Sequence, residues 1–270
     1  MVLSPSKIRK FQKTLFDWWQ DHHRDLPWRK THDPYRILVS EIMLQQTQVL
    51  RVIPKYTEFI EIFPDVSTLA ASTPAQVLRA WKGMGYNRRA LYLRSSAKAI
   101  IESYSGIFPD SATELIKLPG VGIYTACALL VFAYKQDVAM VDTNIRKIIT
   151  HYFFDDKPQK PIDIQRVADQ LVPKGKSWEW HQALMDFGAM ELKVPQASQK
   201  KQKPFRESNR FYRGRIMDRL REREIAEDQL ISSVSKEYGS TKEYIHTIID
   251  GLIADGLTTK KENILSLPES

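Results

Sequence analysis

An acidic residue stands inside an apolar segment, Ile37–Leu44, in which Ser40 and Glu41 are the only polar residues. The apolar spacing predicts a helix over residues 35–49. A carboxyl group among Ile, Met and Leu side chains loses hydration. This favours its protonated form and gives the raised pKa that a general acid needs near neutral pH. The alternative is a structural glutamate paired with a buried arginine or a backbone N–H, and Glu41 alone does not decide between them.

A second acid, Asp142, precedes a predicted helix over residues 144–152. It suits the N-cap position, because its side chain can accept a hydrogen bond from a free N–H of the first turn. The positive end of the helix favours the ionised carboxylate.

The segment Leu118–Gly122, LPGVG, separates two predicted helices. Upstream, Ser111 and Glu114 have the spacing of a capping box at the start of a short helix, which Pro119 ends. The two glycines allow a tight turn, and a helix over residues 123–134 follows at once. Free N–H groups at the start of that helix form an anion site that suits a DNA phosphate, although an ordinary helix connection has the same pattern.

Apolar residues recur at helical spacing along most of the chain. They predict helices over residues 5–20, 52–63, 74–82 and 90–103, and two more between residues 161 and 192. Among these elements, a Gly-x-Gly turn exposes Tyr86 ahead of two arginines. The sequence therefore predicts an all-α fold.

The composition is that of a globular protein with a basic balance. The 270 residues are 43% hydrophobic and 27% charged, with a net charge of +8, which suits a polyanionic partner. Cys127 is the single cysteine, which excludes an internal disulfide and a cysteine-bound metal or cluster. The sequence has no apolar run of about 18 residues and no apolar core of a secretory signal, so we expect a cytoplasmic protein without a membrane segment.

Longer strings of residues resemble one family. Residues 118–126, Leu-Pro-Gly-Val-Gly-Ile-Tyr-Thr-Ala, resemble the helix-hairpin-helix of the endonuclease III/MutY superfamily of DNA base-excision glycosylases, and Val141–Asn144 resembles the loop that completes its motif. Leu26–Arg29 followed by residues 40–49, Ser-Glu-Ile-Met-Leu-Gln-Gln-Thr-Gln-Val, is similar to MutY-type adenine DNA glycosylases. Residues 184–190 resemble the same enzymes.

This resemblance, over residues 5–192, implies a two-lobed helical fold with a hairpin at about 111–134 and a DNA groove, with a base flipped out of the duplex. Glu41 would protonate the leaving adenine and Asp142 would stabilise the sugar cation. Tyr124 and Asn144 would orient the two acids, and Tyr86 would enter the base stack. Arg88 and Arg89 would contact phosphates or form a solvated helix face. The predicted DNA contacts are Arg29, Gln45, Gln46, Thr47, Met84, Tyr86, Arg88, Arg89, Gly120, Val121 and Gly122.

Residue 124 distinguishes two subclasses. Superfamily members that cut the DNA strand have a lysine there for a Schiff base, so Tyr124 predicts a monofunctional glycosylase. A thymine-mismatch branch also has tyrosine, whereas Gln45–Thr47 favours adenine, because in MutY-like enzymes this string lies against the base opposite the lesion. The sequence predicts removal of adenine opposite guanine or 8-oxoguanine. The alternatives are another mispaired or damaged base, such as thymine opposite guanine, and a non-catalytic DNA-binding protein.

The chain departs from the family after residue 192. Most members have four cysteines there that hold an iron–sulfur cluster, and this chain has none. We therefore predict no cluster and no other cofactor, while a cation at the hairpin stays open. Residues 193–210 are predicted to form a basic linker. Residues 211–270 are predicted to form a winged-helix-like module, in place of the larger domain with which many MutY enzymes recognise oxidised guanine.

The predicted organisation is a glycosylase domain over residues 1–192, the linker and the small C-terminal module. We expect a monomer that acts on double-stranded DNA carrying a mispair or a damaged base. In a bacterium or an archaeon, such a protein would associate with the nucleoid.

Overall fold

The computed structural model describes residues 1–192 and 204–269. Nearly all of its regular structure is helical, as predicted, and its strands are two or three residues long. The described chain divides into two compact units, residues 1–42 with 108–192 and residues 43–107 with 204–269. None of the described helices is long and apolar enough to cross a bilayer.

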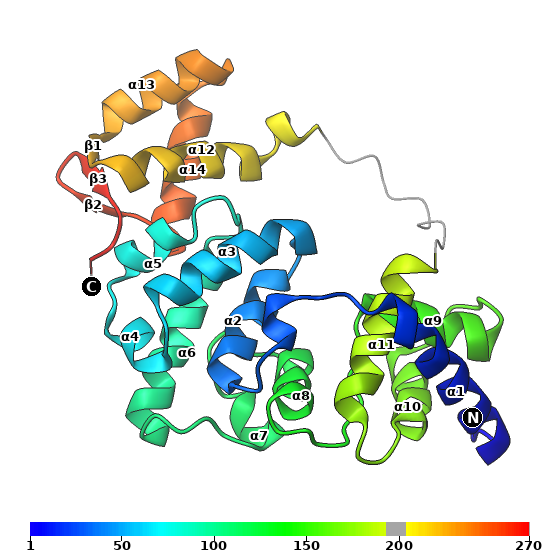
Figure 1. The fold of residues 1–270 in the computed structure, drawn as a ribbon. Coiled ribbons are helices and arrows are strands. Elements are labelled where there is room, and N and C mark those ends of the chain that lie inside the picture. The colour runs from blue at the N-terminus through cyan, green and yellow to red at the C-terminus, as the bar shows by residue number, and fades with distance from the viewer. Residues whose placement is uncertain (193–203, 270) are drawn as a thin grey trace. The chain divides into compact units, whose positions relative to one another are not determined.

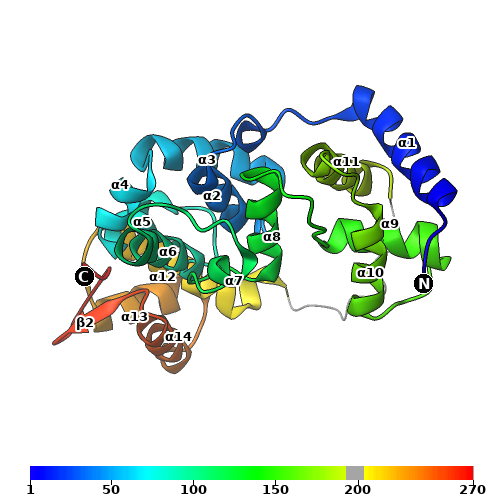
Figure 2. The same cartoon turned by 90° about the horizontal axis from the view of Figure 1, so that it is seen from below.

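The first unit contains the two acids and the glycine turn. Its elements are α1 (Pro5–His22), η1 (Pro27–Arg29), most of α2 (Pro34–Leu44), α7 (Ala112–Leu115), α8 (Ile123–Phe132), α9 (Thr143–Phe154), α10 (Pro161–Leu171) and α11 (Ser177–Met190). One apolar cluster joins α1, α9, α10 and α11, which lie together in Figures 1 and 2. Phe11 and Leu15 bury the predicted apolar face of α1. The ring of Phe11 packs edge-on against Trp180 of α11, with centroids 5.8 Å apart.

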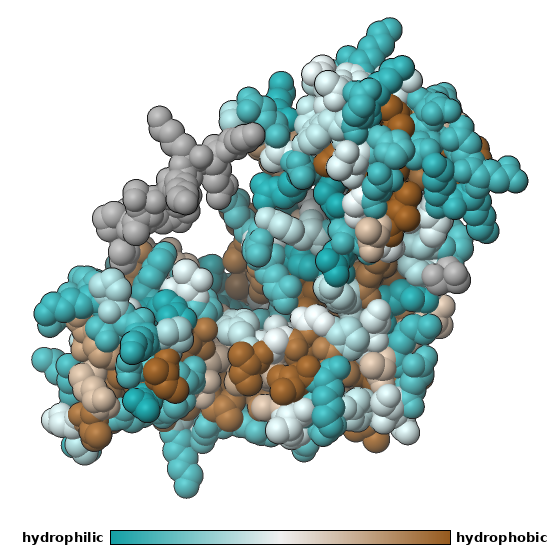
Figure 3. All heavy atoms as spheres, turned by 180° about the vertical axis from the view of Figure 1, so that it is seen from behind, coloured by the Kyte–Doolittle hydropathy of each residue, from teal (hydrophilic) through white to brown (hydrophobic). Residues whose placement is uncertain are grey.

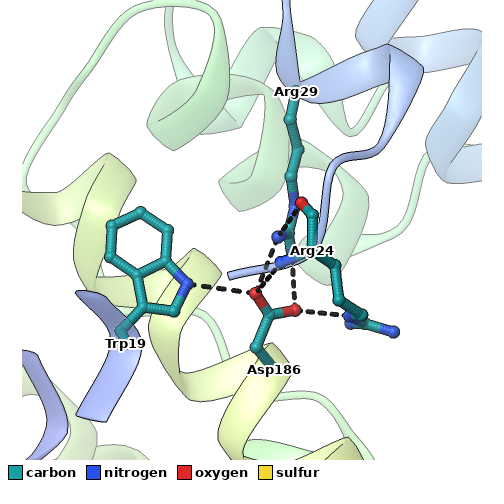
Figure 4. A network of polar contacts seen from close by, with 4 residues as sticks. All are labelled: Trp19, Arg24, Arg29 and Asp186. Atoms are coloured by element: carbon teal, nitrogen blue, oxygen red, sulfur yellow. Dashed lines mark hydrogen bonds and ion pairs between the residues drawn. The ribbon is translucent and has the colours of Figure 1, made fainter. Parts of the chain in front are cut away.

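A buried ion pair joins the segment after α1 to α11 (Figure 4). Asp186 of α11 is 0% exposed and accepts hydrogen bonds from Trp19 Nε1 at 3.0 Å and Arg24 Nε at 2.6 Å. Both terminal nitrogens of Arg29 donate to it at 2.8 Å. Burial opposes ionisation of Asp186, but Arg29, Arg24 and Trp19 together lower its pKa below the ordinary value. The carboxylate therefore stays charged and fixes the loop between α1 and α2.

The second unit begins with four helices. These are α3 (Val49–Ile62), α4 (Val66–Ala71), α5 (Pro74–Ala80) and α6 (Arg88–Tyr104). Phe59 of α3 and Trp81, the residue after α5, are fully buried, and their rings pack edge-on at 5.8 Å. Leu93 and Ile100 bury the inner face of α6. These side chains form a core separate from the cluster of the first unit.

The C-terminal module, residues 204–269, belongs to the second unit. It consists of η2 (Phe205–Glu207), α12 (Asn209–Glu222), β1 (Ile225–Ala226), α13 (Glu227–Tyr238), α14 (Lys242–Ala254), β2 (Thr259–Lys261) and β3 (Ile264–Ser266). The strands form an antiparallel sheet in the order β1-β3-β2 (Figure 1). The tail that the sequence predicts to be a winged-helix-like module thus contains three α-helices and a small sheet among its described residues. Most of the predicted linker, residues 193–210, lies outside the described residues.

Polar contacts attach the C-terminal module to α5 and to the turn before α6. Arg221 of α12 is buried, and its guanidinium donates to the carbonyl of Leu78 and to the side-chain oxygen of Asn87, both at 2.9 Å. The N–H of Ala75 donates to the carbonyl of Pro268 at 2.9 Å. The module therefore packs with α3–α6 in one compact unit.

The helix predicted over residues 35–49 is shorter than expected. It ends at Leu44, because Gln46 has a left-handed backbone with a φ of 53° that an α-helix does not allow. Gln45 belongs to the turn between α2 and α3.

The capping box predicted at Ser111 and Glu114 does not form as expected. Ser111 precedes α7, but its side chain accepts no hydrogen bond from the first turn and lies 3.3 Å from the hydroxyl of Thr113. Glu114 forms an ion pair with Lys117 at 2.6 Å. A helix of four residues leaves little room for the reciprocal pattern of a capping box.

The surface is mainly polar on the face drawn in Figure 3, where hydrophobic residues form small patches between hydrophilic ones. Exposed apolar side chains of the described chain include Leu50, Ile107 and Ile123. Ile123 is 66% exposed at the first position of α8, directly after the glycine turn.

Asp186→Asn removes the negative charge of the buried network and leaves Arg24 and Arg29 facing a neutral amide. We expect the free energy of unfolding at pH 7 to fall by roughly 3–5 kcal/mol, the usual cost of breaking a buried ion pair. Urea denaturation measures it. The control is Asp17→Asn, which removes the exposed partner of Lys13 and should cost less than about 1 kcal/mol. Equal losses in the two variants would contradict the structural role of Asp186.

Candidate active site

Glu41 lies in the C-terminal half of α2 and is buried, with 7% of its surface exposed. Loss of hydration and the nearby charge of Asp142 raise the pKa of the Glu41 carboxyl from 4.5 to about 8. Both causes favour the protonated form, and among the described residues no cation offsets them. Glu41 is therefore held as a proton donor at neutral pH. A structural glutamate paired with a buried arginine would have its pKa lowered instead.

Asp142 is the N-cap of α9, as predicted, and its Oδ1 accepts the N–H of Ile145 at 2.7 Å. Burial raises the pKa of Asp142 above its ordinary value of 3.8. Hydrogen bonds from the N–H groups of Ile145 and Asn144, together with the charge of Lys147, offset part of that rise. The expectation that the helix start keeps this carboxyl ionised is therefore incomplete, because the loss of hydration is the larger effect.

Tyr124 occupies the first turn of α8 and is half-buried. Burial raises the pKa of its phenol well above 10.0, and the charges of Glu41 and Asp142 raise it further. Since both acids act on this phenol, and Asp142 acts on Glu41, the three groups lie around one small region. Asn144, the second residue of α9, donates its backbone N–H to Asp142. The structure thus brings together the four residues predicted to carry the chemistry.

Two residues of α11 position the start of α9. A Cβ added at Gly188 would lie 2.7 Å from Cβ of Asn144, so only glycine allows this close approach. His181 is buried, and its Nε2 accepts the N–H of Met140, two residues before Asp142, at 3.2 Å. Burial lowers the pKa of His181 to about 4, which keeps Nε2 free to accept. Sequence reasoning missed both residues; the available signal was a histidine and a glycine within an apolar helix.

The glycine turn has the geometry that its sequence predicts. Gly120 has a φ of 76°, which favours glycine, and the N–H of Val121 closes the turn onto the carbonyl of Leu118 at 3.1 Å. Gly122 is the exposed N-cap of α8. An added Cβ there would meet no atom within 4 Å, so this side of the turn is open.

The residues present do not fit an iron–sulfur cluster held by four cysteines. Cys127, the one cysteine of the sequence, is half-buried on α8. Within residues 1–192 and 204–269, no group of three His, Cys, Asp or Glu side chains is placed to hold a metal ion.

Residues 39–174 match the family described as HhH-GPD superfamily base excision DNA repair protein. This range includes Glu41, Tyr124, Asp142 and both helices of the hairpin. The chain belongs to this superfamily.

Relatives of this HhH-GPD protein have two different specificities. An adenine DNA glycosylase from Mycolicibacterium smegmatis is 43% identical over 178 residues, which cover 65% of this chain and 61% of the relative. A thymine/uracil-DNA glycosylase from Methanothermobacter thermautotrophicus is 32% identical over 188 residues, which cover 68% of this chain and 85% of the relative. The solved structure of a thermostable thymine-DNA glycosylase is 31% identical with a TM-score of 0.65, over 75% of this chain and 92% of that one. The chain spans only 52–61% of the length of the first three adenine glycosylases.

In the second unit of the HhH-GPD protein, Arg89 joins two turns. Its guanidinium donates to the carbonyls of Met43, near the end of α2, and Gln45, just after α2, and to those of Met84 and Gly85 before α6. Arg89 is only 8% exposed, and loss of hydration lowers its pKa to about 10. The prediction that Arg89 contacts phosphate or forms a solvated face is therefore wrong, because its donors are used inside the protein.

Three further predicted DNA contacts have buried side chains. Arg29 is held by Asp186, with 8% of its side chain exposed, and Met84 is 2% exposed. Neither side chain is available to a duplex, so these two predictions are wrong. Val121 is 6% exposed and could offer DNA only its backbone.

The other predicted contacts of the second unit reach the surface. Tyr86 is 40% exposed and has a φ of 46°, which is uncommon for a residue other than glycine. The side chain of Arg88 is 53% exposed. Gln46 is exposed, while Gln45 and Thr47 are half-buried. The turn after α2 and the turn before α6 therefore form an accessible surface, and the buried side chain of Arg89 joins them.

The pH dependence of the melting temperature of Glu41→Gln tests whether the pKa of the buried Glu41 carboxyl is raised. Because the folded-state pKa is raised from 4.5 to about 8, the folded chain retains a proton that the unfolded chain releases between these values. Stability from this group is therefore present below about pH 4.5 and lost as pH rises to 8. We expect Glu41→Gln to raise the melting temperature relative to the unsubstituted protein, and by more at pH 9 than at pH 5.

The matched control is Glu61→Gln, which changes an exposed carboxyl on α3. Its melting temperature should follow that of the unsubstituted protein at both pH values. A Glu41→Gln difference that does not depend on pH would show that the carboxyl is hydrated.

Proposed function

We propose that this protein is a monofunctional DNA glycosylase that removes adenine mispaired with guanine or 8-oxoguanine. The observation that carries the proposal is the buried carboxyl of Glu41, whose pKa is raised to about 8 by loss of hydration and by the charge of Asp142, with the phenol of Tyr124 in the same region. The match to a base excision DNA repair family supports damaged or mispaired DNA as the substrate. The 43% identity to an adenine DNA glycosylase supports adenine as the base. A net charge of +8 suits a DNA substrate.

Hydrolysis of an N-glycosidic bond needs one acid that donates a proton and one that is ionised, and Glu41 and Asp142 suit these two roles. The base leaves more easily when it takes up a proton, and the sugar passes through an oxocarbenium-like state. Glu41 donates its proton to the flipped adenine as the bond from the base nitrogen to C1′ breaks. Asp142 in its ionised form stabilises the positive sugar. Water then bonds to C1′, and the proton that it loses returns to Glu41.

Tyr124 and Asn144 hold these acids in place. The phenol of Tyr124 stays protonated, because its pKa is well above 10.0, and can donate a hydrogen bond to a carboxylate. The N–H of Asn144 supports Asp142, and Gly188 fixes where Asn144 lies. Tyr124 and Asn144 are therefore positioning residues for the reaction.

The second candidate function is removal of thymine or uracil. The 32% identical thymine/uracil-DNA glycosylase supports it, because this chain covers 85% of that relative. Burial of Glu41 and Asp142 does not distinguish the leaving bases. Adenine is favoured by the higher identity of the adenine-specific relative.

The deciding experiment incubates the purified protein with duplexes that each carry one mispair, followed by alkali to cut abasic sites. Adenine opposite guanine or 8-oxoguanine should be released, and the strand should break only after alkali. Release of thymine or uracil instead would select the second candidate. Binding without release of any base would contradict the enzymatic proposal.

Glu41→Gln should lower single-turnover excision by at least about 100-fold, the usual contribution of a general acid. Binding to the same duplex should stay within a few-fold of the unsubstituted protein, because the glutamine has the same size. Glu61→Gln, on the exposed face of α3, serves as the control for both measurements. Near-normal excision by Glu41→Gln would remove this residue from the mechanism.

Tyr124→Lys should introduce an amine that can form a Schiff base with the sugar, which borohydride converts to a stable protein–DNA adduct. The unsubstituted protein should give no adduct, because Tyr124 has no amine. If it does give one, the monofunctional assignment is wrong. Lys147→Ala would then show whether the lysine whose charge acts on Asp142 is responsible.

A further inference from the structure

A groove lies in the second unit between the C-terminal module and the two turns that Arg89 joins. Its volume is about 500 Å³, which is in the range of a small-molecule site. One wall comes from α12 and the residues just after α14, and the other from the turn after α2 and from the turn before α6 with the start of α6. Its lining includes Gln45, Tyr86, Arg88, Arg210, Arg213 and Gly214.

Arg210 of α12 lies between two exposed aromatic rings. Its guanidinium is 5.4 Å from the ring centroid of Tyr86 and 5.0 Å from that of Phe205. Its Nη1 also donates to the hydroxyl of Tyr86 at 2.7 Å. Tyr86 is 40% exposed and Phe205 55% exposed. Guanidinium groups interleaved with exposed aromatic rings offer flat surfaces on which nucleobases stack.

The groove carries an excess of positive charge. Arg88 and Arg213 share one carboxylate, Asp255, with Arg88 Nη1 at 3.3 Å from it. Arg213 reaches this position over Gly251, where an added Cβ would lie 3.2 Å from its Nη1. With Arg210 and the mostly buried Arg89, four arginines and one acid line the groove. Such a groove attracts a phosphate group and can hydrogen-bond to the acceptor edge of a purine.

The groove is also open at two glycines. A Cβ added at Gly85 or at Gly214 would meet no atom within 4 Å. On the same side, Tyr86 and Gln46 have left-handed backbones that cost free energy, and Arg89 holds both of their turns. Strained turns around an open, positively charged groove favour a binding role over a packing role.

We propose that this groove binds a nucleotide of the DNA substrate, and that α12 supplies the arginines that hold its phosphate and stack against its base. The proposal deepens the proposed function and depends on it for the identity of the ligand. Gln45, Tyr86 and Arg88 line this groove and are also among the predicted DNA contacts. In this way the C-terminal module takes a direct part in recognition.

The test measures the dissociation constant of the full chain for a duplex with one adenine–guanine mispair at several salt concentrations. Glu41→Gln is present throughout, so that excision does not alter the duplex. Adding Arg210→Ala should weaken binding several-fold and lower the slope of log affinity against log salt by about 0.9, the value for one phosphate contact. Gly214→Leu should weaken binding without changing the net charge, because its side chain fills the open groove.

The matched control is Arg223→Ala, which removes an exposed arginine of the same module outside the groove. It should leave affinity and salt slope nearly unchanged. Melting temperatures confirm folding, and Gly214→Leu should not lower them, because leucine forms helix more readily than glycine. Equal effects of Arg210→Ala and Arg223→Ala would overturn the proposal, as would normal binding by Gly214→Leu. Base release by the unsubstituted protein tests the proposed function separately.

Discussion

Two carboxyl groups in one poorly hydrated region cannot both ionise at low cost, and this constraint governs the first unit. Glu41 takes the larger share of it, with a pKa raised to about 8. Asp142 escapes part of the same penalty, because backbone N–H groups at the start of α9 bind its oxygens. The local backbone therefore makes one acid a proton donor and the other the better anion. Chemically similar side chains acquire different roles from their surroundings.

This difference requires accurate placement of three separate elements. Glu41 comes from α2, Tyr124 from the first turn of α8 and Asp142 from the start of α9. Helix α11 supports the arrangement from behind, where Gly188 admits Asn144 and His181 holds the backbone at Met140. Asp186, on the same helix, fixes the segment that leads into α2. One helix that carries none of the proposed chemistry thus supports both acids.

The sequence predicts the two acids of the candidate site better than it predicts which arginines lie on the surface. A carboxyl within Ile37–Leu44 must be desolvated in any helix that buries its neighbours, and an aspartate before a helix readily becomes its N-cap. Both predictions depend on local sequence and agree with the structure. The arginines are different, because a charged side chain gives no local sign of its partner. Arg89 finds carbonyls up to 46 residues away and Arg29 finds Asp186, 157 residues away, so sequence spacing did not reveal that either is buried.

The buried guanidinium of Arg89 makes two turns mechanically dependent on each other. Because the same side chain binds carbonyls of both, a shift of Gln45 pulls on the backbone at Gly85, and the reverse also holds. Tyr86 and Gln46 therefore cannot rearrange independently around a bound ligand. Selection acting on residue 89 would act on the shape of both turns at once, although its side chain touches the solvent very little.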